Sequence, residues 1–303
     1  NAALAMLAAS CLTAEEVILH NVPTTTTSKN MLSLAQKLGS DFKMADRTLT
    51  IKTEQITRRN LTHEETNGFV GALLYLAPII VQRQFVRMEI DFPLARIRTH
   101  LEAMRDLGLD VNIVEGAVEI RGTSWDYKDI ILTQASVTAT AITLMLAACL
   151  GKETVIHNAA SEPHIQQLAN LVEMMGAQIQ GLPSNVLRVF GKTDALNGAE
   201  VTLRPDHVEV ASIAAISALT DGRIQINGTV ENDLRVIDKI YQRLGIYLDI
   251  DSELVLVPRH NTLVVSNREE DVDSSIETMP WPGFPSDLVA VATVVATQAR
   301  GTS

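Results

Sequence analysis

Cysteine is scarce in this sequence, which has only Cys11 and Cys149 among its 303 residues. Both lie in apolar helical patterns and offer neither a disulfide framework nor metal-ligand spacing, so we expect them to be core residues. Aromatic residues are also few, at 4%, although 46% of the chain is hydrophobic. A core built mainly from Ala, Val, Ile and Leu is typical of closely packed helices and sheets. A reducing cytoplasm is compatible with this composition.

Long apolar runs and basic clusters are missing too. The most apolar stretch, 141–150, gives way to Gly151-Lys152-Glu153, well short of the roughly 18 to 20 residues of a membrane span. With 25 basic and 36 acidic residues the formal charge is -11, and no stretch gathers Lys and Arg into a basic face. We therefore expect a soluble protein with no membrane segment and no nucleic-acid partner.

One supersecondary pattern recurs through the chain. A hydrophobic residue plus Gly, followed by a short strand pattern, occurs at Gly39, Gly108, Gly176 and Gly245, at intervals of 69, 68 and 69 residues. Each Gly follows a helical pattern, as expected for a left-handed C-terminal cap. Each unit is predicted to be an apolar helix, a strand, a second helix and two short strands. In the third unit these cover residues 136–150, 154–157, 165–175, 177–180 and 186–189.

The polar run 192–197 and the Arg204-Pro205-Asp206 segment indicate a domain boundary. We expect residues 1–203 to form a first domain of three units and residues 204–303 to form part of a second, with a ligand cleft between them. A fourth unit opens with helix 209–219 and strand 223–226, and a fifth opens with helix 287–298. Since that unit stops half-built and the first helix has no preceding cap, we expect a chain shortened at both ends. A naturally short product is the alternative.

Five segments, in the same order, resemble the UDP-N-acetylglucosamine 1-carboxyvinyltransferase family of enolpyruvyl transferases. They are NAAL (1–4), SVTAT (136–140), NAASEP (158–163), PDHVE (205–209) and PGFPSD (282–287). The resemblance runs through the whole chain, and PGFPSD favours the sugar-nucleotide enzymes over those acting on shikimate 3-phosphate. It implies six units in two domains, each an inside-out α/β barrel with helices in the middle. The repeat pattern agrees with this α/β fold.

The resemblance also implies a reaction. The enolpyruvyl group of phosphoenolpyruvate would move to the 3-hydroxyl of UDP-N-acetylglucosamine with release of phosphate, the first committed step of peptidoglycan precursor synthesis in the cytoplasm. We expect no cofactor and no metal. The chemistry needs a general acid for C3 of phosphoenolpyruvate, a base for the hydroxyl, and cations for phosphate and carboxylate.

The resemblance assigns the base to Asp287 and the acid to Asp91, with Arg96 five positions later. Asp287 follows a Pro-flanked turn, and a plain N-cap worth about 1 kcal/mol is the alternative. Asp91 stands where most family members have a loop Cys, and a carboxylic acid can protonate carbon if burial raises its pKa. The alternative is that Asp91 merely ends a strand over 87–90.

The remaining family positions that contact substrate match Asn1, His100, Ser136, Val137, Glu162, Asp206 and Glu209. Amides near Ser136, at a helix N-terminus, suit a diphosphate. Each acidic position also has a plain reading: Asp206 could cap a helix and Glu162 could occupy a turn. His100 could be an ordinary helix-surface residue.

Four positions depart from the family pattern. Asn67 and His207 replace arginines, Gln134 replaces a Lys and Thr138 replaces a Gly. Each lost charge-assisted contact costs about 1.5 to 3 kcal/mol. A weak enzyme, an enzyme with another acceptor, and a non-catalytic paralogue that binds a sugar nucleotide or a partner therefore stay open. A bare repeat scaffold would explain the period but not the PGFPSD segment.

Overall fold

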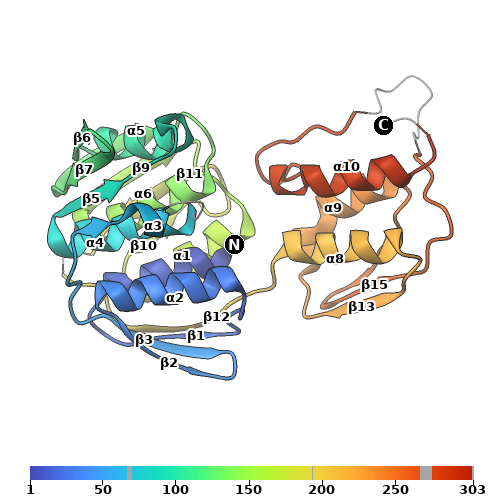
Figure 1. The fold of residues 1–303 in the computed structure, drawn as a ribbon, viewed down its shortest axis with the longest axis horizontal. Helices are drawn as coiled ribbons and strands as arrows, with labels where there is room; N and C mark the ends of the chain where they lie inside the picture. Colours follow the sequence, from blue (N-terminus) through green and yellow to red (C-terminus); the bar gives the residue numbers. More distant parts are fainter. Residues whose placement is uncertain (67–69, 193, 267–274, 302–303) are drawn as a thin grey trace. The chain divides into compact units, whose positions relative to one another are not determined.

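The computed structural model describes residues 1–66, 70–192, 194–266 and 275–301. The chain forms two compact units, Asn1–Arg204 and Pro205–Ser303 (Figure 1). Each unit has its own cluster of buried hydrophobic residues. That residues 1–203 form a first domain of three repeat units, and residues 204–303 part of a second domain, stays a prediction.

Three helices form the centre of the first unit: α1 (Ala2–Ala9), α4 (Leu76–Arg83) and α6 (Val137–Leu150). They pack against one another. The sequences of α1 and α6 are apolar on every face, and a helix of this kind is stable only when other elements surround it. Accordingly, seven of the eight α1 residues and ten of the fourteen α6 residues are buried. Short 3-10 helices adjoin α1 and α4, at Ser10–Leu12 (η1) and Val70–Tyr75 (η2).

Three amphipathic helices pack on this centre: α2 (Thr26–Leu38), α5 (Arg98–Asp106) and α7 (Pro163–Met174). The predicted helix-ending glycines have φ of 110° at Gly39, 93° at Gly108, 111° at Gly176 and, in the second unit, 82° at Gly245. The left-handed cap prediction is therefore confirmed at all four repeats.

The first unit has three four-stranded sheets of the same design: an edge strand pairs in parallel with its neighbour, and the other two pairings in the sheet are antiparallel. The first is β12 (Ala199–Thr202), β1 (Val17–His20), β3 (Thr48–Lys52) and β2 (Asp41–Ala45). The second is β4 (Asn60–Leu61), β5 (Phe85–Glu89), β7 (Ala117–Arg121) and β6 (Asp110–Val114). The third is β8 (Trp125–Ile131), β9 (Gly151–His157), β11 (Val186–Phe190) and β10 (Gln178–Gln180).

Burial alternates along these strands, as in Val17–His20 and Val186–Phe190, so each sheet has one buried face. Helices occupy the middle of the unit and the sheets lie outside them (Figure 1). This arrangement is the inverse of a barrel whose strands form the centre.

The second unit contains α8 (His207–Leu219), β13 (Ile224–Asn227), α9 (Glu231–Arg243), β14 (Asp249–Asp251), β15 (Leu254–Val257), η4 (Ser286–Leu288) and α10 (Val289–Gln298). Its described strands form one sheet in the order β13-β15-β14. Helix α8 packs against α9 and α10. The buried Tyr241 hydroxyl donates to the Ala211 carbonyl at 2.8 Å, which ties α9 to α8.

Several predicted element limits were wrong by a few residues. The strand expected at 154–157 begins at Gly151, because β9 pairs with β8 from Trp125 onward. The helix expected at 165–175 begins at Pro163, a residue that suits the first helical position because its missing N–H has no intrahelical acceptor. Cys11 is fully buried, as predicted, whereas Cys149 is partly buried at the edge of the core.

Candidate active site

The start of α6 carries two of the predicted binding residues, Ser136 and Val137. Ser136 is the N-cap, and its side chain accepts from the Ala139 N–H at 3.3 Å. Val137 is the first helical residue. The first-turn N–H groups of a helix have no intrahelical acceptors and lie at the positive end of its dipole. This end of α6 can therefore bind an anion through backbone amides.

His100 lies beside that helix start. Its Nε2 is 2.7 Å from the Thr138 hydroxyl oxygen, which joins the first turn of α5 to the first turn of α6. The side chain is buried, with 6% of the residue exposed, so the helix-surface interpretation was wrong. Burial lowers the pKa of His100 to about 4, because the low-dielectric surroundings disfavour the charged form. At neutral pH His100 is therefore a neutral hydrogen-bonding group.

A second link brings Glu162 to the same region. The Thr140 hydroxyl, on the first turn of α6, accepts from the Ala160 N–H at 2.9 Å in the segment that leads into α7. Glu162 occupies the N-cap position of α7, and its carbonyl accepts from the Ile165 N–H at 2.9 Å. The structure therefore brings His100 to the helix start that carries Ser136 and Val137, and it joins the segment before Glu162 to the same first turn. Asn1 holds the N-cap position of α1.

Asp91 and Arg96 lie on the chain between β5 and α5. Strand β5 ends at Glu89, so Asp91 follows the strand rather than ending it. Arg96 is exposed on the 3-10 helix η3 (Leu94–Ile97), and no described residue forms an ion pair with its guanidinium. The Asp91 side chain is 39% exposed. The Asp91 carboxyl group is therefore open to solvent and not buried, and its role as general acid stays a prediction.

Asp91 instead pairs with His63, a residue that the sequence analysis missed. His63 Nε2 lies 2.5 Å from Asp91 Oδ2. The contact follows from parallel pairing of β4 with β5, in which Leu61 lies opposite Met88. Residues that follow two parallel strands leave the sheet at the same edge, so the short helix α3 (His63–Thr66) begins next to the loop of Asp91. A pairing between positions 28 apart in sequence has no local signal.

In the second unit, Asp206 is the N-cap of α8. Its Oδ1 accepts from the Val208 and Glu209 N–H groups at 2.9 and 3.3 Å, which confirms the capping interpretation. Glu209 is exposed on the first turn. Asp287 lies on η4, which packs against α8. The N-cap positions of η4 and α10 are Pro285 and Leu288, so the N-cap interpretation of Asp287 was wrong.

His207, which takes the place of a family Arg, is buried at the start of α8, and its ring lies 5.0 Å from that of Trp281, centroid to centroid. Burial lowers the pKa of His207, although the carboxylates of Asp206, Asp233 and Asp287 oppose the shift. Asp206, His207, Glu209 and Asp287 thus meet at one end of α8. Of the other substituted positions, Gln134 is exposed two residues before Ser136, and Asn67 lies outside the described residues.

Within the described part of the chain, no helix is long and apolar enough to cross a membrane. Among the same residues, there is no group of three or more His, Cys, Asp and Glu side chains that could hold a metal ion.

Comparison with known proteins identifies relatives along the whole chain. The model of the EPSP synthase (3-phosphoshikimate 1-carboxyvinyltransferase) family matches residues 1–303. A UDP-N-acetylglucosamine 1-carboxyvinyltransferase of Borreliella burgdorferi is 33% identical over 308 residues, covering 100% of this chain and 71% of the relative. The protein of the same name in Treponema denticola is 31% identical and covers 100% of this chain and 72% of the relative.

Two solved structures show the same fold. The enolpyruvyl transferase NikO from Streptomyces tendae superposes with a TM-score of 0.84 at 16% identity, covering 99% of this chain and 71% of that one. An EPSP synthase from Acinetobacter baumannii gives a TM-score of 0.65 at 14% identity, covering 88% and 64%. These likenesses confirm the predicted inside-out α/β fold.

Proposed function

The chain belongs to the EPSP synthase family of carboxyvinyltransferases, and from this premise we propose that it transfers the enolpyruvyl group of phosphoenolpyruvate to the 3-hydroxyl of UDP-N-acetylglucosamine. The observation that carries the proposal is identity of 31 to 33% along the whole chain to proteins that bear this activity in their name. The Pro282-Gly283-Phe284-Pro285-Ser286-Asp287 segment, typical of the sugar-nucleotide enzymes, adds to it. The product would enter peptidoglycan synthesis in the cytoplasm.

The described geometry suits the binding part of this proposal. The N-terminus of α6, with Ser136 and Val137, offers backbone amides to the uridine diphosphate. His100 would contribute a hydrogen bond rather than a charge, since its pKa of about 4 leaves it neutral. Arg96 would hold the phosphate or carboxylate of phosphoenolpyruvate, because its guanidinium is exposed and no described residue pairs with it. Asn1, Glu162, Asp206 and Glu209 are proposed as further substrate contacts.

For the chemical steps, Asp91 would protonate C3 of phosphoenolpyruvate, and the electron pair of the C2=C3 bond would form the new C3–H bond. The sugar hydroxyl would then attack C2 while Asp287 takes its proton. In the elimination, the C3 proton would return to Asp91, the double bond would re-form, and the C2–O bond to phosphate would break with its electrons on phosphate. The departing phosphate would take the hydroxyl proton from Asp287, which regenerates the base. These steps make and break C–H, O–H and C–O bonds without any change in overall oxidation state, so they require no redox cofactor.

The direct test is phosphate release by the full-length gene product, given phosphoenolpyruvate with and without UDP-N-acetylglucosamine. Release should require both substrates. Asp91→Asn should lower kcat by about 10² to 10⁴, the usual contribution of a general acid. Asp129→Asn is the matched control, because Asp129 is also an exposed aspartate paired with a histidine, on β8. Release without the sugar nucleotide, or equal rates for the two variants, would contradict the proposal.

A binding protein without catalysis is the second candidate, and the neutral residue at Gln134 favours it. A family Lys is replaced there, two residues before the anion-binding helix start, so one positive contact to a diphosphate is lost. In a thermal-shift screen of UDP-sugars, stabilisation by a sugar nucleotide without phosphate release would support this candidate. Release with a different UDP-sugar would instead support an enzyme with another acceptor.

A further inference from the structure

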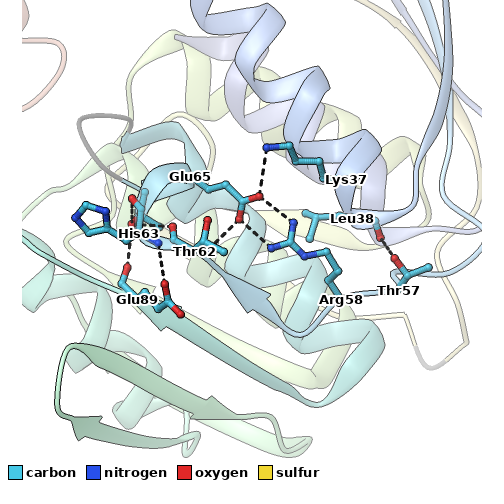
Figure 2. A network of polar contacts seen from close by, with 9 residues as sticks. Lys37, Leu38, Thr57, Arg58, Thr62, His63, Glu65 and Glu89 are labelled. Atoms are coloured by element: carbon cyan, nitrogen blue, oxygen red, sulfur yellow. Dashed lines mark hydrogen bonds and ion pairs between the residues drawn. The ribbon is translucent and has the colours of Figure 1, made fainter.

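Helix α3, which begins next to the loop of Asp91, is fixed in place by hydrogen bonds and ion pairs. Thr62 precedes it, and the Glu65 carboxylate accepts from the Thr62 N–H at 2.9 Å, as in a capping box. The same carboxylate forms two hydrogen bonds with the Arg58 guanidinium, at 2.8 and 3.1 Å, and lies 3.6 Å from Lys37 Nζ (Figure 2). Burial would raise the pKa of Glu65, but the bonds to Arg58 and Thr62 outweigh it and the pKa is lowered. Glu65 therefore stays ionised and fixes the start of the helix.

Two further bonds attach α3 to the end of β5, both through Glu89. The His63 N–H donates to the Glu89 carboxylate at 3.1 Å, and the Thr66 hydroxyl donates to the Glu89 carbonyl at 2.9 Å. Figure 2 shows His63 and Glu89 joined in this way next to the Glu65 network. Since Asp91 follows Glu89 by two residues, the His63 backbone and the Asp91 loop share one anchor. The His63–Asp91 contact is therefore fixed by the backbone contacts at the edge of the sheet, and it does not depend on the two side chains alone.

We propose that His63 is a positioning residue for proton transfer, which fixes the Asp91 carboxylate and stores the proton that Asp91 delivers to C3. The inference rests on the proposed function, because it gives His63 a part in that reaction. Histidine is the side chain best suited to gain and lose a proton near neutral pH. The His63 imidazole lies 2.5 Å from the solvent-exposed Asp91 carboxylate, so it is placed to pass a proton to that group.

The proton balance closes over one turnover. Before addition the His63–Asp91 pair holds one extra proton, and after addition it is a neutral imidazole beside a carboxylate, while the proton is in the C3–H bond. Elimination returns that proton to Asp91 and restores the pair. His63 holds only Oδ2 of Asp91, and no described residue makes a polar contact with Oδ1, so this oxygen can face the substrate.

The test compares His63→Ala and His63→Gln with His157→Gln in the full-length gene product. His157 is a matched control, because its Nε2 lies 3.0 Å from Asp129 with side-chain exposures of 41% and 52%, against 46% and 39% for His63 and Asp91. The measurements are kcat and KM for phosphoenolpyruvate, and deuterium uptake at C3 of phosphoenolpyruvate in D2O. The rate of His63→Ala is also measured with added imidazole.

We expect His63→Ala to lower kcat and deuterium uptake about ten- to a hundredfold, part of the usual general-acid contribution, with KM nearly unchanged. Imidazole should restore part of this rate. His63→Gln should still form a hydrogen bond with Asp91 but cannot store the proton. The kcat of His157→Gln should equal that of the parent protein. If the parent is active and His63→Ala keeps its kcat, or loses rate that imidazole does not restore, the inference is overturned and the proposed function stands. If the parent itself releases no acceptor-dependent phosphate, the proposed function fails and the inference fails with it.

Discussion

The buried His100 predicts a specific loss of stability in acid. Its pKa is about 4 in the folded chain, against about 6.5 for histidine in an unfolded chain. Protonation therefore favours the unfolded state, and the free energy of unfolding should fall as the pH drops below about 6.5 and level off below about 4. Such a difference in pKa corresponds to a loss of about 2 kcal/mol at pH 5 and about 3 kcal/mol at pH 4.

Urea denaturation at pH 7.5, 6, 5 and 4 measures this loss when the parent is compared with His100→Gln. The Gln variant should be less stable at pH 7.5, because the packing and the bond to Thr138 are disturbed. It lacks the titrating group, so the stability advantage of the parent should shrink by about 3 kcal/mol between pH 7.5 and pH 4. His157→Gln, which changes a partly exposed histidine, serves as the control. Parallel stability curves for the parent and His100→Gln would refute the reasoning.

Three further substitutions test separate features. Gly39→Ala should lower the free energy of unfolding by about 1 to 3 kcal/mol in urea titrations, since φ is 110° and a Cβ would lie 2.7 Å from the Gln55 carbonyl oxygen; Gly116→Ala, with φ of 67° and nothing within 4 Å, should cost less. Asp206→Ala should cost about 1 kcal/mol in thermal or urea unfolding through loss of the α8 cap, whereas Asp206→Asn should cost only a few tenths, and equal costs would argue against the cap. Gln134→Lys should tighten UDP-N-acetylglucosamine about tenfold by calorimetry, and unchanged affinity would show that the diphosphate does not bind at this helix start.

The repeat made most of the first unit predictable. Apolar helices with no polar face, such as 137–150, must lie in the centre of a fold, and a Gly after each second helix marks where the chain turns into a strand. These signals are local, so they can be recognised in short stretches of the sequence. Element limits shifted where a pairing partner decided them: Gly151 joins β9 because Trp125 lies opposite it.

The candidate site was less accessible to sequence reasoning. Helix starts at Ser136, Glu162 and Asp206 carry recognisable capping or Pro signals, so positions near them could be named. The burial of His100 depends on α5 packing against α6, and the partner of Asp91 depends on the β4–β5 register. Both depend on contacts between residues that are far apart in the sequence, so no short stretch of the sequence predicts them.

The pairing of β12 with β1 has a consequence for the order of folding. Val17 lies opposite Ala199, and flanking contacts join Thr13 to the Leu196 carbonyl and Asn21 to the Leu203 carbonyl at 2.5 and 3.0 Å. The sheet that begins first along the chain is thus completed last, by residues that leave the ribosome some 180 positions later. Contacts so distant in sequence form slowly, because a long loop must close before they contribute. Until then the β1 edge stays open, and during synthesis it is exposed to pairing with another chain.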